Sequence, residues 1–309
     1  MQSICFVTAT YGRDIEQFAI LRESLRRFAP DYHHLAVVHN EDFSQFRDRF
    51  GRQPGLELRK TSDVLPSSIE RRRRKSTRPW AKTLTRLLYG RWYSGWHFQQ
   101  LTKMHVLAAL DYDAAAFIDS DVFLCRPIRS DYFFVGDELK LFRRRAVTAE
   151  QLGFDISTHA ILRNSLHEIT EFYDYVFQPA CFRKTTGISL LKRLRARSAW
   201  VYRFLIENLA SEYNLLGYAA TALEKGVGYR LVECNPEDLV LQVRYAKDRE
   251  RLAQEIAALA GRPRDFVWIQ SRLRVDAGTI RSVFESVATA GAGAVGTART
   301  QRVTPVTRV

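Results

Sequence analysis

Short apolar runs and one amphipathic segment alternate along the N-terminal part of the chain. Residues 4–8 are apolar and lead into Thr8-Ala9-Thr10-Tyr11-Gly12, which predicts a buried strand that opens into a turn. Apolar residues then recur at helical spacing over 18–28, up to Pro30. A second apolar run at 35–39 ends in the polar residues 40–42. A strand, a helix and a strand in succession indicate a parallel βαβ unit.

The rest of the chain continues this pattern. Helices are predicted at 97–110 and 199–210, and a third from Ser211 to the stop signal Lys225-Gly226. Strands are predicted at 114–118, 138–142, 229–232, 239–243 and 266–269. We therefore expect an α/β fold with a Rossmann-like, mainly parallel sheet flanked by helices. One domain covers 1–287 with a basic, aromatic insertion at 66–95, and residues 288–309 are predicted to form a disordered basic tail.

The chain has 309 residues and a formal net charge of +13, which favours anionic partners such as nucleic acid, anionic lipid or a nucleotide diphosphate. Basic runs at 71–75, 143–145 and 192–197 supply much of the excess. They could contact an anionic membrane, bind an anionic glycan or lipid-linked acceptor, or form solvated loops. Arginines between aromatic residues over 71–96 are typical of single-strand binders, but no nucleic-acid-binding motif accompanies them, which disfavours that partner.

Cysteine spacing and hydropathy bear on the compartment. The four cysteines are far apart and form no CxxC pair, which indicates neither a zinc site nor a disulfide framework and fits a reducing compartment. The first residues lack a basic secretory-signal segment, and no apolar run reaches the ~20 residues that span a bilayer. We expect a cytoplasmic protein that meets a membrane only peripherally, at its inner face.

The clearest chemical signal is Asp119-Ser120-Asp121, which follows the apolar strand predicted at 114–118. Two aspartates around one small residue can direct their carboxylates to a common point. Mg²⁺ and Mn²⁺ prefer such oxygen ligands and complete their shells with phosphate oxygens and water. A metal there would neutralise charge on a departing diphosphate. An acidic turn after a strand is the simpler alternative.

Two further segments carry candidate polar residues. Gln99, Gln100 and Lys103 lie on the helix before this strand, and Gln99 and Lys103 share a face that could bind a diphosphate or sugar hydroxyls. A solvated face is the alternative. Residues 185–187, Thr-Thr-Gly, are expected to form a turn near a sugar, or an ordinary loop.

Three blocks of this chain resemble a bacterial family of glycosyltransferase-like proteins of unassigned specificity. The blocks are a QQxxK helix at 99–103, the DSD motif at 119–121 and an SEYxxxG helix start at 211–217. The resemblance covers roughly residues 4–270 and implies a GT-A fold, a nucleotide-sugar donor and a divalent metal, Mn²⁺ or Mg²⁺. The implied acceptor is a cell-surface polysaccharide or glycolipid.

The resemblance also implies site residues. Asp119 and Asp121 would bind the metal. The nucleotide and donor would contact Thr8, Tyr11, Asp14, Asn40, Asp42, Gln99, Gln100, Lys103 and Ser120. Many GT-A enzymes add a late histidine ligand, but the last histidine here is His167, so Gln270, Ser271, phosphate or water would substitute.

Glu212 is the candidate catalytic base. Ser211 is a good N-cap, which puts Glu212 in a first helical turn where the macrodipole favours the ionised carboxylate. Such a carboxylate can take the proton of an acceptor hydroxyl, although glutamate is also common in first turns for stability alone. The rival functions are a nucleotidyltransferase on a similar fold and a basic nucleic-acid-binding protein.

Overall fold

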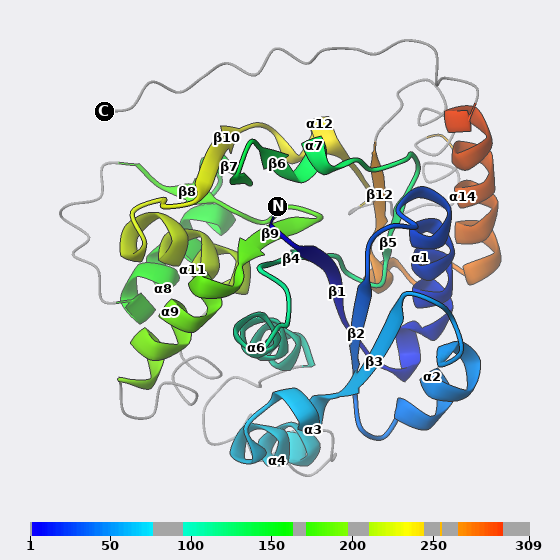
Figure 1. Ribbon diagram of the computed structural model, residues 1–309, viewed down its shortest axis with the longest axis horizontal. Coiled ribbons are helices and arrows are strands. Elements are labelled where there is room, and N and C mark those ends of the chain that lie inside the picture. Colours follow the sequence, from blue (N-terminus) through cyan, green and yellow to red (C-terminus); the bar gives the residue numbers. More distant parts are fainter. Residues whose placement is uncertain are drawn as a thin grey trace.

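The main sheet of the protein has five strands in the order β3-β2-β1-β4-β9 (Figure 1). A computed structural model describes residues 2–76, 95–162, 171–196, 210–243, 254 and 265–292. The strands are β1 (Ile4–Thr10), β2 (His34–Val38), β3 (Leu56–Lys60), β4 (Ala114–Phe117) and β9 (Ala180–Arg183). The first four are parallel, and β9 pairs antiparallel with β4. The predicted fold class, an α/β protein with a mainly parallel sheet flanked by helices, is confirmed.

Helices cover both sides of this sheet (Figure 1). Helix α6 (Gly95–Ala108) packs on β1 and β4, whereas α1 (Ile15–Phe28) and α2 (Phe43–Phe50) lie on the other side. All seven residues of β1 are buried, as expected for a parallel strand covered on both faces. Phe18, Leu21 and Leu25 of the predicted amphipathic stripe are buried on the inner face of α1.

Two smaller sheets complete the framework. In the first, β7 (Glu138–Arg145) pairs with β6 (Phe134–Val135), β8 (Tyr173–Asp174) and β10 (Tyr229–Glu233). In the second, β12 (Phe266–Ile269) lies between β11 (Val240–Val243) and β5 (Val122–Leu124). The antiparallel pairing of β12 with β5 brings the chain after Ile269 beside the DSD motif.

The remaining described helices surround these sheets. The short segments are η1 (Gly12–Asp14), α3 (Thr61–Val64), α7 (Ser130–Phe133), α12 (Pro236–Leu239) and η4 (Ser271–Leu273). The longer helices are α4 (Ser67–Ser76), α8 (Ala149–Leu162), α9 (Lys184–Arg195) and α14 (Ala277–Ala292). Helix α11 (Glu212–Tyr218) continues into a π-helical turn, Ala219–Leu223, so the predicted helix from Ser211 is present.

Four predicted segments differ from the structure or lie partly outside the described residues. Residues 185–187 belong to the first turn of α9 rather than to a loop. A side chain at Gly187 would collide with Leu107 and with the backbone of Ala108. Most of the helix predicted at 199–210 and residues 77–94 of the basic insertion lie outside the described residues. Helix α14 continues to Ala292, so the predicted tail boundary at 288 falls inside a helix. Residues 293–309 of the predicted tail lie outside the described part.

One arginine of the basic run is a structural residue. Arg73, on α4, is buried and donates to the carboxylates of Glu70 (2.7 and 2.8 Å) and Glu41 (2.6 and 2.8 Å). Its neighbours Arg71, Arg72, Arg74 and Lys75 are exposed. The helix is therefore anchored by one cation of the run and presents the others at the surface.

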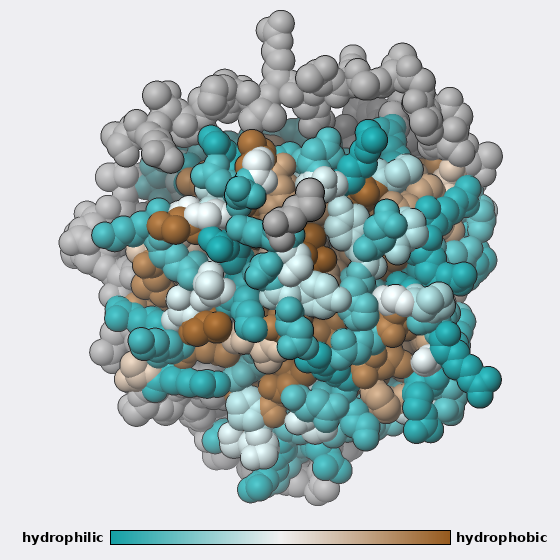
Figure 2. Space-filling model, in the orientation of Figure 1, coloured by the Kyte–Doolittle hydropathy of each residue, from teal (hydrophilic) through white to brown (hydrophobic). Residues whose placement is uncertain are grey.

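On the face seen in Figure 2, hydrophobic residues are scattered among hydrophilic ones. No helix in the described part of the chain combines the length and the apolar character needed to cross a bilayer.

Candidate active site

A central cavity of about 420 Å³ lies beside β1 and β4, where the order in which the chain adds strands to the main sheet reverses. From β1 the chain adds β2 and β3 on one side, whereas β4 lies on the other. In open α/β sheets, ligands bind at the carboxyl ends of the strands at such a switch point. The residues that follow β1 and β4 here, including Tyr11, Asp14 and Asp119, line the cavity. The topology therefore places the DSD motif at the expected binding position.

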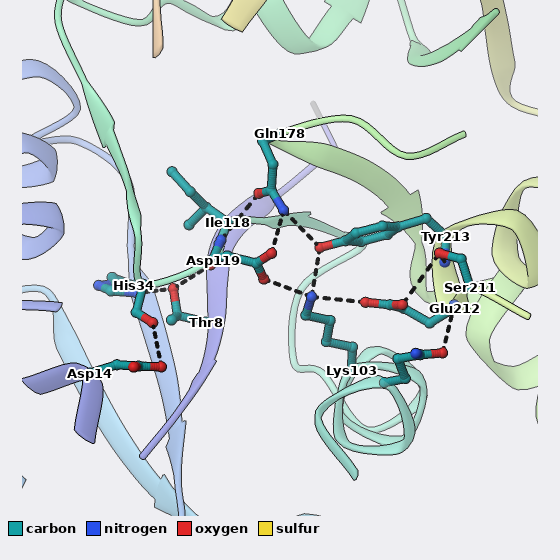
Figure 3. Close-up of polar contacts among 12 residues, drawn as sticks. Thr8, Asp14, His34, Lys103, Ile118, Asp119, Gln178, Ser211, Glu212 and Tyr213 are labelled. Atoms are coloured by element: carbon teal, nitrogen blue, oxygen red, sulfur yellow. Dashed lines mark hydrogen bonds and ion pairs between the residues drawn. The ribbon is translucent and has the colours of Figure 1, made fainter. Parts of the chain in front are cut away.

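Lys103 holds the first carboxylate of the motif. Its Nζ donates to Asp119 Oδ1 (2.7 Å), to Glu212 Oε1 (2.8 Å) and to the hydroxyl of Tyr213 (2.7 Å), as Figure 3 shows. An ammonium group has three donors, and all three are used. Burial acts to lower the pKa of Lys103, but the charges of Asp119 and Glu212 raise it well above its ordinary value. Lys103 is therefore a charged part of the cavity wall.

Gln178 holds the other oxygen of Asp119. Its Nε2 donates to Asp119 Oδ2 (2.6 Å), and its Oε1 accepts from the backbone N–H of Asp119 (3.1 Å) (Figure 3). This residue precedes β9, the antiparallel neighbour of β4, which explains how it reaches the end of β4. Gln178 was not predicted from the sequence, because a single glutamine before Pro179 belongs to no motif.

Asp121 differs from Asp119 in its partners. Its Oδ2 accepts from the backbone N–H of Ser271 (2.8 Å), whereas its buried Oδ1 has no hydrogen-bond partner in the described part of the chain. Burial, followed by the charge of Asp119, raises the pKa of Asp121 to about 7. The cavity wall thus contains a carboxylate oxygen that lacks a compensating donor.

A third carboxylate, Asp14, lies on the same side of the cavity. It is 6% exposed, and Ser120 Oγ donates to its Oδ2 at 3.4 Å. Burial is the main cause that raises its pKa to about 6. Tyr11, also in the wall, stacks on His39 at 5.4 Å between ring centroids. Once ionised, Asp14 and Asp121 make this side of the cavity favourable for a cation, and a bound cation in turn favours their ionised forms.

The residues fit a divalent cation that shares its shell with a bound ligand. Carboxylate oxygens suit Mg²⁺ and Mn²⁺, and the unpaired Oδ1 of Asp121 would gain a partner. The buried Oε1 of Gln270, which also lines the cavity, has no hydrogen-bond partner among the described residues either. In the described part of the chain, no group of three or more His, Cys, Asp and Glu side chains is arranged to hold a metal by itself.

Glu212 occupies the predicted first turn of α11. Ser211 caps the helix by accepting from the N–H of Tyr213 (3.2 Å), as its sequence position predicts. Glu212 is 3% exposed, and its carboxylate accepts from Lys103. The backbone N–H of Glu212 donates to Gln100 Oε1 (3.2 Å). Glu212 lines the cavity, but one of its oxygens is already used to hold Lys103. Its assignment as a catalytic base stays a prediction.

Three predicted donor-binding residues do not line the cavity. Thr8 is fully buried, and its hydroxyl donates to the carbonyl of Ile118 (2.8 Å). Asn40 Oδ1 accepts from Thr61 and Ser62. Asp42 accepts from the N–H of Gly12 (2.8 Å), where a side chain would collide with its carboxylate. These polar groups shape the turns at the ends of β1 and β2, which the sequence analysis interpreted as ligand contacts.

The other predicted site residues come together. Tyr11, Asp14, Gln99, Gln100, Lys103, Asp119, Ser120, Asp121 and Glu212 all line the cavity. Besides Gln178, six lining residues were not predicted from the sequence: Trp96, Glu150, Phe154, Val176, Tyr213 and Trp268. Gln270 and Ser271, named as substitutes for a late histidine, also lie there.

Residues 2–290 match the family described as "Family of unknown function (DUF6492)". The chain belongs to this family. No curated protein matches its sequence. The match to the DUF6492 family includes the strands, α6, α11 and every residue of the central cavity.

Three solved glycosyltransferase structures show partial similarity to this chain. They are the WbbM bifunctional glycosyltransferase (12% identity, TM-score 0.40), mouse xyloside xylosyltransferase 1 (8%, 0.40) and galactosyltransferase LgtC with donor and acceptor sugar analogues (12%, 0.43). The alignments cover 86%, 86% and 92% of this chain, and 45%, 97% and 95% of those chains. This chain thus spans less than half of WbbM. The identities and TM-scores are low, so its function has to be inferred from its own residues.

Proposed function

We propose that this protein is a glycosyltransferase of the GT-A type, which transfers a sugar from a nucleotide-sugar donor to an acceptor hydroxyl. The observation that carries the proposal is the unpaired, buried Oδ1 of Asp121 in a cavity at the switch point of the sheet. Asp14 adds a second carboxylate, which accepts from Ser120 and forms no salt bridge within the described part of the chain. A cation would compensate the negative charge of these carboxylates, and a nucleotide diphosphate bound with it would occupy the switch point where α/β sheets bind ligands.

Asp121 and Asp119 would hold Mn²⁺ or Mg²⁺, with phosphate oxygens and water completing the shell. The ion, when bound, neutralises negative charge on a departing nucleoside diphosphate. Gln178 and Lys103 fix both oxygens of Asp119, so this carboxylate has one defined orientation before any ligand binds. Such preorganisation avoids the cost of ordering the site during the reaction.

The polar residues around the cavity would orient the donor. Tyr11 and Asp14 follow β1 and are the candidates for the nucleotide side, and Gln99 on α6 is the candidate for sugar hydroxyls. Since Lys103 uses all three donors internally, we propose that it supports Asp119 rather than binding the donor directly. Glu212 would act through Lys103 in the same way, unless it releases Lys103 to serve as a base.

We propose a cell-surface polysaccharide or a glycolipid as the acceptor, with the reaction in the cytoplasm. The exposed basic residues of α4 are Arg71, Arg72, Arg74 and Lys75, and they would attract anionic lipid at the inner face of the membrane. Binding to anionic liposomes that fades as salt rises would support this location. The control is a triple variant, Arg71→Ser, Arg72→Ser and Arg74→Ser. If it binds the liposomes as strongly as the wild type does, the proposed membrane location is contradicted. Arg73 stays unchanged, because its burial makes it part of the fold.

The test of the proposed function is a donor screen with the purified chain. UDP-, GDP- and dTDP-sugars are incubated with Mn²⁺, and the released products are analysed. A nucleoside diphosphate is the expected product of glycosyl transfer to water or to an acceptor. A parallel assay supplies a nucleoside triphosphate and a sugar 1-phosphate, from which the rival nucleotidyltransferase would form a nucleotide sugar and release pyrophosphate. No turnover in either assay would argue against both functions.

A further inference from the structure

One face of α6 leads from the opening of the central cavity to its floor. Trp96, Gln99, Gln100 and Lys103 all line the cavity, and their spacing places them on one side of the helix. Trp96 is 40% exposed, whereas Gln100 and Lys103 are 1% and 4% exposed. The face therefore begins with an accessible aromatic ring and ends at the carboxylate of Asp119.

Helix α8 lines the cavity next to Trp96. Glu150 and Phe154 are four residues apart on α8, so they share a face, and both line the cavity. The rings of Phe154 and Trp96 lie 6.5 Å apart between centroids, at an interplanar angle of 47°. An exposed tryptophan, a second aromatic ring, an amide and a carboxylate thus surround the outer part of the cavity.

From these residues we infer that the outer part of the cavity is a subsite for a second sugar ring of a saccharide acceptor. The inference rests on the proposed function, because it takes Asp119 as the position of the reaction. Trp96 and Lys103 are seven residues apart on α6, which corresponds to about 10 Å along the helix axis. This leaves room for one sugar ring beside the one that reacts.

The composition of the subsite fits a sugar ring. A pyranose has an apolar face of C–H groups that packs on an aromatic ring, and a rim of hydroxyls that needs hydrogen-bond partners. Trp96 and Phe154 would supply the aromatic surface, and Gln99 and Glu150 would supply an amide and a carboxylate. Binding sites commonly combine apolar and aromatic walls with a few polar groups that fix orientation. Acceptors of two or more sugars should accordingly bind better than monosaccharides.

The experiment is a binding assay on an array of defined mono-, di- and oligosaccharides, with UDP and Mn²⁺ present. We expect the wild type to bind some saccharides of two or more rings, and Trp96→Ala to weaken that binding at least tenfold. Trp96→Phe, which keeps an aromatic ring, should retain binding within about threefold. The matched control is Ile156→Ala, since Ile156 is 49% exposed on α8 but does not line the cavity.

Two results would overturn the subsite: no saccharide bound by the wild type, or equal binding by the wild type and a folded Trp96→Ala protein. Donor hydrolysis by the wild type is measured in parallel and tests the proposed function separately. Donor hydrolysis without saccharide binding would contradict the subsite but not the proposed function. Saccharide binding that depends on Trp96, without turnover of any donor, would support a saccharide site and contradict the proposed transferase function.

Discussion

The two aspartates of the DSD motif lie in opposite electrostatic environments. Both oxygens of Asp119 accept hydrogen bonds from side chains, and one of the donors is the ammonium group of Lys103. Asp121 accepts hydrogen bonds from Ser271, keeps a buried Oδ1 without a partner among the described residues, and has Asp14 as a neighbouring carboxylate. The motif thus combines a carboxylate whose charge is already compensated with one whose charge is not.

This difference suggests separate roles for the two aspartates: one supports the shape of the site, and the other binds a cation. A carboxylate whose two oxygens both accept from side-chain donors has a fixed orientation, but it has little to gain from a ligand. A carboxylate with a buried oxygen that lacks a donor is destabilising by itself and gains from a bound cation. We infer that the Asp119 side gives the site its shape and that the Asp121 side supplies most of the affinity for the cation.

Removal of the compensating cation should have the largest effect. Lys103→Met keeps the length of the side chain but leaves the buried Glu212 and the partly exposed Asp119 without their positive partner. Breaking a buried ion pair costs about 3–5 kcal/mol, so we expect a loss of that size in the free energy of unfolding. Urea denaturation measures it. Lys75→Met, at an exposed position on α4, should change the stability by less than about 0.5 kcal/mol. Equal stability of Lys103→Met and the wild type would show that the two carboxylates need no counter-charge.

Glu212→Gln tests whether Glu212 belongs to the supporting side. Loss of a general base lowers transfer by about 10² or more, and disordering of Asp119 through Lys103 could do the same. The affinity for the donor distinguishes these causes. A base acts after the donor has bound, so its removal leaves that affinity intact, whereas a positioning role lowers affinity and transfer together. The hydrogen bond from Lys103 leads us to expect a parallel loss, measured by calorimetry and transfer kinetics.

Unchanged donor affinity with a hundredfold loss of transfer would instead establish Glu212 as the base. Full transfer activity in a folded Glu212→Gln protein would exclude both roles.

Asp121→Asn tests the binding side. In the proposed site a charged ligand of the metal becomes neutral, so Mn²⁺-dependent binding of UDP or GDP should weaken at least tenfold, about 1.4 kcal/mol. The same change removes a buried charge that faces Asp119 and Asp14, so the protein should be at least as stable as the wild type. Calorimetry and thermal unfolding provide the two measurements. Unchanged, metal-independent nucleotide affinity would contradict the assignment of Asp121.

Much of the fold could be predicted from the sequence, because its strands are local features. The apolar runs before Tyr11, Asn40 and Asp119 became β1, β2 and β4 in the expected parallel arrangement. The DSD motif could be placed because a strand end is fixed by sequence position alone. Helix α8 was missed, since its apolar residues lack a clear helical stripe and its buried face includes polar Gln151, Asp155 and Thr158.

The partners within the site could not be predicted, because they depend on contacts between distant segments. Gln178 and Asp119 are 59 residues apart, and Lys103 and Glu212 are 109 apart. Nothing local distinguishes a lysine that binds phosphate from one that holds two carboxylates. Thr8 shows the same difficulty, since its hydroxyl follows an apolar run but is used inside the sheet.

A carboxylate outside the cavity provides the last test of the comparison. Asp155, on α8, is fully buried, and its Oδ1 accepts from Asn214 Nδ2 (2.9 Å). Its Oδ2 has no hydrogen-bond partner among the described residues, like Oδ1 of Asp121. Burial, followed by the charge of Asp174, raises the pKa of Asp155 to about 8. Asp155 does not line the cavity, so we expect its unpaired oxygen to affect stability and not ligand binding.

The sign of the pH dependence follows from the raised pKa. The folded protein holds the proton of Asp155 more tightly than the unfolded chain does, so the stabilisation is complete below about pH 4, the ordinary range of an aspartate. It is lost progressively as the pH rises toward 8. Asp155→Asn keeps the acceptor for Asn214 and removes the titration. At pH 8 the variant should therefore be more stable than the wild type by about 1–3 kcal/mol, the cost of a buried polar group without a partner.

Thermal unfolding at pH 5 and pH 8 measures this difference, with Asp137→Asn as the control at an exposed aspartate. The gap between variant and wild type should widen with pH, while Mn²⁺-dependent nucleotide binding stays the same. A gap that is constant with pH would mean that Asp155 does not titrate in this range. A loss of nucleotide binding in Asp155→Asn would mean that an unpaired buried carboxylate outside the cavity also acts on the site, and the distinction drawn from Asp121 would fail.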